Sequence, residues 1–196
     1  GAATLRAAAQ SSSVALAGLD AERLRRALAQ REITAYFQPQ HCVSTGELRG
    51  AEMLARWVAD DGTMIPPAAF LPAFESAGLL GSLTDYMLAR AFEALRELGN
   101  RPDCVISINV PATVASSICW AQDVADRAEF AGVDPSRIVI EITEDGGARS
   151  NGALARAVTQ LRLRGFSCAI DDFGTGDSSL DRLLCAPFDE LKIDRD

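Results

Sequence analysis

The sequence has 196 residues, of which 48% are hydrophobic and 23% are charged, and its formal net charge is -8. This length accommodates one domain with a sizeable core, and no apolar run approaches the roughly 18 residues that a membrane-spanning helix needs. The acidic balance argues against a broad nucleic-acid surface, because neutralising a phosphate backbone takes clustered Lys and Arg. An anionic ligand would need a metal ion to help hold it.

The five cysteines are odd in number, and no two have CxxC spacing. With His41 as the only histidine, a zinc site is not predicted. We therefore expect buried, reduced thiols, as is typical of a cytoplasmic protein. Residues 1–19 are rich in Ala and Ser and are interpreted as a linker or N-terminal extension, followed by a domain over residues 20–196.

The first half of the chain is predicted to contain a helix, a pair of strands and two more helices. Asp20 is placed as an N-cap, Pro66 and Pro67 open a helix, and Gly78 closes it. The turn signal STG separates the two extended runs. In chain order, these elements are expected at residues 20–30, 32–40, 46–57, 66–78 and 82–99.

After residue 103, strands and helices alternate with short loops. This alternation predicts βα units and a parallel sheet. The strands are expected at residues 104–110, 137–143, 166–173 and 190–194. The helices are expected near residues 113–131, at residues 151–165 and after Ser178.

Side chains alternate between the two faces of a strand, so each strand can be divided into a helix-covered face and an inward face. In residues 137–143, three isoleucines share one face and Glu141 lies on the other. Contributions from five strands favour a TIM-like (β/α) barrel over an open doubly wound sheet, which binds ligands only at a switch point. The inward polar residues are Glu52, Arg56, Asn109, Glu141, Asp171, Lys192 and Asp194.

This inward group consists of carboxylates and an amide, without His or Cys, and such hard oxygen ligands suit Mg²⁺ or Mn²⁺. The adjacent Asp171 and Asp172 would each serve a different ion, as in a two-metal site for phosphoryl displacement. Lys192 and Arg56 would supply positive charge where a phosphate lies. Taken singly, each of these residues is more often a helix cap or a surface ion pair; their joint position on one face favours a site.

Seven short segments follow one another along the chain: FQPQ, AEMLARW, IPPAAFLPAFESAGLL, SINV, EITE, DDFGTG and LKIDR. In this order they resemble the EAL-domain family, the phosphodiesterases that hydrolyse the bacterial second messenger cyclic di-GMP (c-di-GMP). The resemblance runs from about residue 22 to the end of the chain and implies the EAL type of TIM-like barrel.

The resemblance implies two metal-binding sets, for Mg²⁺ or Mn²⁺. Glu52 also belongs to the implied catalytic residues. The first set would be Glu52, Asn109, Glu141 and Asp171, and the second Asp171, Asp172 and Asp194.

The resemblance also implies roles for five other residues. Lys192 would orient or deprotonate the attacking water, and Glu144 would steady the loop DFGTGDSS. Arg56 and the backbone of Leu54 would contact a phosphate, and Gln38 a guanine. The implied reaction is in-line attack of activated water on one phosphodiester of c-di-GMP, giving linear pGpG.

Three positions depart from the family pattern. Met53 replaces an alanine of the signature, Pro111 stands where Ser is usual, and Asp177 stands where the loop usually has Tyr. The family continues with two further strand and helix units after LKIDR. We therefore expect the chain to be a fragment, truncated after the sixth barrel strand, with an incomplete barrel.

The expected partners are c-di-GMP, a second copy of the chain in a homodimer, and an upstream sensory or receiver domain. A catalytically weak or inactive c-di-GMP receptor that acts through protein partners is the alternative function, and Pro111, Asp177 and the expected missing strands motivate it. A third alternative is another Mg²⁺-dependent barrel, such as an enolase-like lyase, which has only the carboxylates in its favour.

Overall fold

The computed structural model describes residues 19–59, 62–99, 104–143, 151–173 and 183–193, without the side chains of residues 172 and 173. The chain divides into two compact units. One comprises Gly1–Tyr36 and Ala55–Met87, and the other comprises Phe37–Leu54 and Leu88–Asp196.

The first unit has an aromatic core. Trp57, Phe70 and Phe74 are fully buried, and neighbouring rings pack edge to face with centroids 5.8 and 6.0 Å apart. Burying a side chain of this kind contributes about 1.5–3 kcal/mol. The Asp20 side chain accepts a hydrogen bond from the Arg23 backbone N–H, in the first turn of the helix that follows it, which confirms the predicted N-cap. The unit contains α2 (Ala21–Ala29), β3 (Met64–Ile65), α3 (Pro67–Ser76) and the start of α4 (Leu80–Glu97).

A half-buried carboxylate, that of Glu32, accompanies this aromatic core. Glu32 accepts hydrogen bonds from the indole N–H of Trp57 at 2.9 Å and from the guanidinium of Arg23 at 3.0 Å. The same guanidinium lies 5.0 Å from the centre of the Trp57 ring. Trp57 therefore has a polar partner for its only donor, as buried indoles usually do.

The sheet has the order β1-β2-β4-β5-β6-β7, with β3 paired to the end of β2. From β2 to β7, each strand is parallel to its neighbour in this order, which confirms the parallel sheet. Among the described residues, no pairing joins β1 to β7. The strands are β1 (Ile33–His41), β2 (Leu48–Val58), β4 (Val105–Pro111), β5 (Ile138–Thr143), β6 (Ser167–Phe173) and β7 (Glu190–Ile193).

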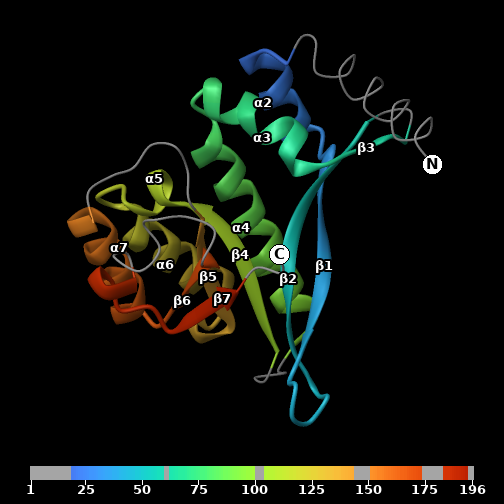
Figure 1. Cartoon of the computed structure of the whole chain (residues 1–196). Helices are drawn as coiled ribbons and strands as arrows, with labels where there is room; N and C mark the ends of the chain where they lie inside the picture. The colour runs from blue at the N-terminus through green and yellow to red at the C-terminus, as the bar shows by residue number, and fades with distance from the viewer. Residues whose placement is uncertain (1–18, 60–61, 100–103, 144–150, 174–182, 194–196) are drawn as a thin grey trace. The chain divides into compact units, whose positions relative to one another are not determined.

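Helices cover one face of the sheet in the second unit (Figure 1). The isoleucines predicted to face them, Ile138 and Ile140, are fully buried, and Leu161 packs in the same core. The connecting elements are α5 (Ala112–Ala115), α6 (Trp120–Ala131), the 3₁₀ turn η1 (Pro135–Arg137) and α7 (Asn151–Leu163).

A glycine allows β2 and β4 to approach. Gly50 pairs with Val105, and a Cβ atom at Gly50 would lie 2.3 Å from the Val105 carbonyl oxygen. Real Cβ atoms do not come so close to another atom, so a side chain here would push the strands apart. This pairing matters for the site because Glu52 follows two residues later on β2.

Two expectations from the sequence are wrong. The single helix predicted near residues 113–131 is two helices, because Ser116 ends α5 as its C-cap and α6 begins only at Trp120. The cysteines are free, but only Cys168 is buried, whereas Cys119 and Cys185 are exposed. The helix expected after Ser178 falls largely outside the described residues.

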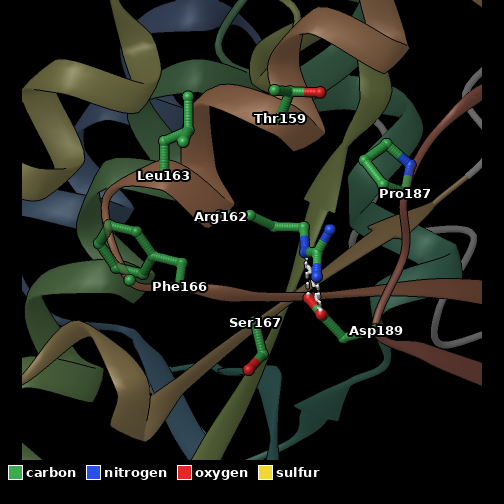
Figure 2. Close-up of a pocket in the computed structure, with 8 residues that line it drawn as sticks. Thr159, Arg162, Leu163, Phe166, Ser167, Pro187 and Asp189 are labelled. Atoms are coloured by element: carbon green, nitrogen blue, oxygen red, sulfur yellow. Dashed lines mark hydrogen bonds and ion pairs between the residues drawn. The ribbon is translucent and has the colours of Figure 1, made fainter.

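A surface pocket of about 370 Å³ lies beside the end of α7 and the start of β6 in the second unit (Figure 2). Arg162 and Asp189 both line it, and their side chains contact each other. Within the described part of the chain, no helix has both the length and the apolar character needed to span a membrane.

Candidate active site

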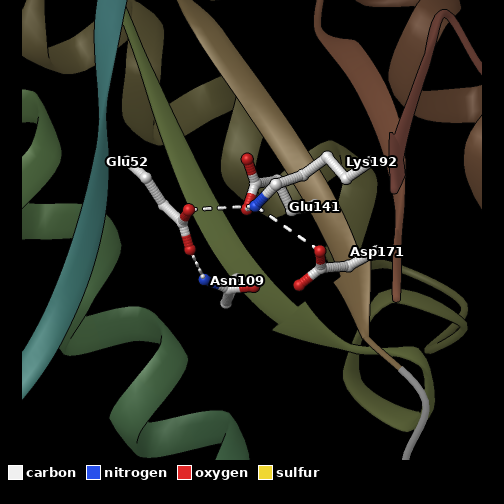
Figure 3. Close-up of polar contacts among 5 residues, drawn as sticks. All are labelled: Glu52, Asn109, Glu141, Asp171 and Lys192. Carbon is white, nitrogen blue, oxygen red and sulfur yellow. Dashed lines mark hydrogen bonds and ion pairs between the residues drawn. The ribbon is translucent and has the colours of Figure 1, made fainter. Parts of the chain in front are cut away.

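Side chains from five parallel strands meet in the second unit (Figure 3). The alternation of side chains along each strand predicts that these five residues point inward, and the structure brings them together. They are Glu52 on β2, Asn109 on β4, Glu141 on β5, Asp171 on β6 and Lys192 on β7.

The Lys192 ammonium is the centre of this group. It donates hydrogen bonds to Glu141 Oε2 at 2.7 Å and to Glu52 Oε2 at 3.0 Å. A third carboxylate oxygen, Asp171 Oδ1, lies 3.5 Å away. The amide of Asn109 donates to the other oxygen of Glu52 at 2.9 Å. Three carboxylates therefore share one cation.

The registers of the strands explain this convergence. Asn109 pairs directly with Glu141, so the two lie at the same level of the sheet. Glu52 pairs with Ser107, two residues before Asn109. Ala169 pairs with Glu141, which places Asp171 two residues further on. Such a stagger between parallel strands is typical of sheets that form barrels.

Glu141 is the most buried member, with its side chain 1% exposed. Burial raises the pKa of Glu141 to about 7, and the negative charge of Glu52 acts in the same direction. The hydrogen bonds from Lys192 and Ser107 oppose this rise in pKa only in part. Burial therefore outweighs the stabilisation that the Lys192 ammonium gives to the Glu141 carboxylate.

For the pKa of Lys192, the hydrogen bonds and not burial decide the direction of the change. Burial alone would lower the pKa of its ammonium, but the hydrogen bonds to Glu141 and Glu52 outweigh burial and raise that pKa above its ordinary value. In this arrangement the ammonium keeps its proton and acts as a donor.

The donor set fits a hard divalent cation in its chemistry, because it offers carboxylate and amide oxygens only. As the side chains lie, however, no three His, Cys, Asp or Glu side chains among the described residues are arranged around a cation position. The Lys192 ammonium stands between the carboxylates instead (Figure 3). A bound cation would have to compete with Lys192 for the same oxygens.

The other predicted site residues are distributed differently. Gln38 is exposed on β1 and Leu54 is half-buried on β2, both in the second unit. Arg56 belongs to the first unit, where its guanidinium donates to the Ala55 carbonyl at 2.8 Å. The side chain of Asp172 and the whole of Glu144, Asp177 and Asp194 lie outside the described residues.

Ser107 is a residue of the site that the sequence did not single out. It is buried on β4, and its hydroxyl hydrogen bond lowers the pKa of Glu141. The same alternation that predicts Asn109 also turns Ser107 inward, so the signal was present in the strand pattern.

The fold and this site define a class: an α/β protein with a parallel sheet that gathers carboxylates, an amide and a lysine from successive strands. The sequence profile of the EAL domain matches residues 21–196. The chain belongs to the EAL domain family, which confirms the resemblance seen in its motifs.

Two curated relatives illustrate the similarity. MucR of Pseudomonas aeruginosa, named a bifunctional diguanylate cyclase and cyclic di-GMP phosphodiesterase, is 33% identical over 88% of this chain and 25% of its own length. PdeB of Escherichia coli, named a probable cyclic di-GMP phosphodiesterase, is 35% identical over 88% of this chain and 34% of its own. The chain thus spans about a quarter to a third of these relatives.

Solved structures agree with the family. The MucR phosphodiesterase in complex with c-di-GMP has a TM-score of 0.80 and 32% identity, covering 88% of this chain and 71% of that one. An EAL domain protein from Listeria monocytogenes has a TM-score of 0.74 and 25% identity, covering 86% and 66%. The chain has the EAL domain fold.

Proposed function

We propose that the chain is a catalytic domain that hydrolyses c-di-GMP to linear pGpG with Mg²⁺ or Mn²⁺. The observation that carries this proposal is the convergence of Glu52, Glu141 and Asp171 on Lys192. Relatives named as c-di-GMP phosphodiesterases support the substrate. We also propose that the whole protein acts in signalling, as a homodimer with an upstream sensory or receiver domain.

In this proposal the chain's carboxylates and Asn109 hold the metal ions. Glu52, Asn109, Glu141 and Asp171 would bind one ion, and Asp171 would share the second with Asp172 and Asp194. The bound ions supply Lewis-acid activation of water and charge neutralisation at the phosphodiester.

The remaining residues would orient the attacking water and the substrate. Lys192 would orient or deprotonate the attacking water, depending on how many carboxylates it keeps as acceptors. Arg56 and the backbone of Leu54 would hold a phosphate, Gln38 a guanine, and Glu144 the loop that follows β6. Fixing the water in line with the scissile bond removes much of the entropic part of the barrier.

Hydrolysis of c-di-GMP by the intact protein tests the proposal. With Mg²⁺ or Mn²⁺ we expect pGpG as product, and we expect Glu52→Gln to lower kcat by about a hundredfold or more, because the neutral amide is a poor cation ligand. The matched control is Glu47→Gln, since Glu47 is exposed in the turn before β2.

Three results would contradict this function. Turnover of Glu52→Gln equal to the wild type would remove the site from the reaction. Tight c-di-GMP binding without turnover, even with Mn²⁺, would instead indicate a receptor. A product other than pGpG would point to different chemistry in the same fold.

A further inference from the structure

Asp189, the residue before β7, pairs with β6 in an unusual way. Its backbone N–H donates to the Cys168 carbonyl at 2.8 Å. Its side-chain Oδ2 accepts from the Cys168 backbone N–H at 2.9 Å. Asp189 therefore extends the β6–β7 ladder by one position, with a carboxylate in the place of a backbone carbonyl.

Arg162, in the last turn of α7, fixes the direction of that carboxylate (Figure 2). Its Nε donates to both oxygens of Asp189, at 2.9 and 3.1 Å, and Nη2 lies 2.8 Å from Oδ1. Forked contacts between a guanidinium and a carboxylate are strong and geometrically specific. The helix, β6 and the start of β7 are thus joined at one side chain.

Apart from Asp189, few contacts set the register of strand β7. Its described part has four residues, and only the pairs Ala169↔Glu190 and Ile170↔Leu191 come before the register becomes irregular. None of the side chains of β7 is buried. Register is strongly specified where one face of a strand is buried and weakly specified where neither is.

The register of β7 decides where Lys192 points. A shift by one residue turns every side chain of a strand to the opposite face, which would take the ammonium away from Glu52 and Glu141. We propose that Asp189, held by Arg162, is a positioning residue that sets the register of β7 and so delivers Lys192 to the carboxylates. The effect on turnover rests on the proposed function, whereas the effect on β7 does not.

Kinetics of the intact protein test the proposal. Asp189→Ala and Arg162→Ala should lower kcat by about tenfold to a hundredfold with little change in KM, because a displacement of about 1 Å in a reacting group has effects of this size. Asp189→Asn keeps an acceptor for Cys168 and should lose less. Glu93→Ala, which removes an exposed ion pair on α4, is the matched control and should keep the wild-type kcat.

The substitution Asp189→Ala in the Lys192→Met variant separates a positioning role of Asp189 from a general effect on stability. If Asp189 acts through Lys192, then adding Asp189→Ala to Lys192→Met should lower the residual kcat no further. A further decrease of the same factor as in the wild type would overturn the proposal, as would a folded Asp189→Ala variant with wild-type kcat.

Amide hydrogen exchange gives a readout that does not need activity. Asp189→Ala should speed exchange of the β7 amides by about tenfold and leave the β4–β5 amides unchanged, because only the β6–β7 pairing loses its clamp. Unchanged β7 exchange would overturn the positioning role. A wild-type protein that binds metal but does not hydrolyse c-di-GMP would refute the proposed function. The exchange of the β7 amides would still decide whether Asp189 positions β7.

Discussion

At the scale of single residues, Glu141 is a buried carboxylate of the site. Its side chain is 1% exposed, and its pKa is raised to about 7, chiefly because burial removes it from water. A carboxyl whose pKa is higher in the folded than in the unfolded state stabilises the fold below its unfolded pKa and progressively less as pH rises through the folded value. Without a divalent cation, the domain should therefore lose stability between about pH 4.5 and 7.

Replacing the Glu141 carboxyl by an amide tests whether its raised pKa makes the stability depend on pH. In EDTA, the free energy of unfolding of wild type minus that of Glu141→Gln should fall by an amount on the order of 2 kcal/mol between pH 5 and pH 8. Urea unfolding at both pH values measures it. Glu190→Gln, at an exposed position of β7, is the matched control. A difference for Glu141→Gln that does not change with pH would contradict the raised pKa of Glu141.

At the scale of elements, the close approach of β2 and β4 depends on Gly50. A Cβ atom there would lie 2.3 Å from the Val105 carbonyl oxygen, so Gly50→Ala must shift one strand against the other. We expect a loss of about 1–3 kcal/mol of stability and a larger loss of activity, since Glu52 and Asn109 lie on these two strands.

Another glycine provides the comparison for Gly50→Ala. Gly152 lies in α7, and nothing would meet a Cβ atom there within 4 Å. Gly152→Ala should therefore stabilise by about 0.5–1 kcal/mol, as expected for alanine in a helix. Denaturation and activity assays on both variants measure the difference between them. If Gly50→Ala and Gly152→Ala changed stability and activity equally, the close approach of β2 and β4 would not be what requires glycine at residue 50.

At the scale of the whole molecule, divalent cations should be linked to folding. A cation that binds only the folded state adds RT ln(1 + [M]/Kd), about 2.7 kcal/mol at a hundredfold excess over Kd. Mn²⁺ should thus raise the unfolding midpoint of the wild type and of Glu190→Gln, and raise it much less in Asp171→Asn. Equal shifts in all three would place the ion elsewhere.

Much of the fold and part of the site could be predicted from the sequence. Runs such as RIVIEIT alternate so regularly that the pattern alone assigns Glu141 to the inward face. Parallel pairing then brings Asn109 to the same level, as the β4–β5 register shows. The strand pattern is informative because a one-residue error would bury the wrong set of side chains.

Other features depend on tertiary contacts that no local pattern encodes. The sequence predicts that Lys192 supplies positive charge where a phosphate lies, but its partners Glu52 and Glu141 are 140 and 51 residues away in the chain. The contact of Arg162 with Asp189 likewise joins elements 27 residues apart. Side-chain partners of this kind follow from packing, which the sequence specifies only through the complete fold.

The position of the Lys192 ammonium gives the domain a built-in counterion. Three acidic groups would otherwise repel one another in the metal-free protein, but one tethered cation already neutralises part of their charge. In the proposed function, loading with a divalent ion would then be an exchange of cations inside an assembled site, and not the step that assembles it. We therefore expect the metal-free domain to fold, with the supply of divalent ions controlling the proposed activity.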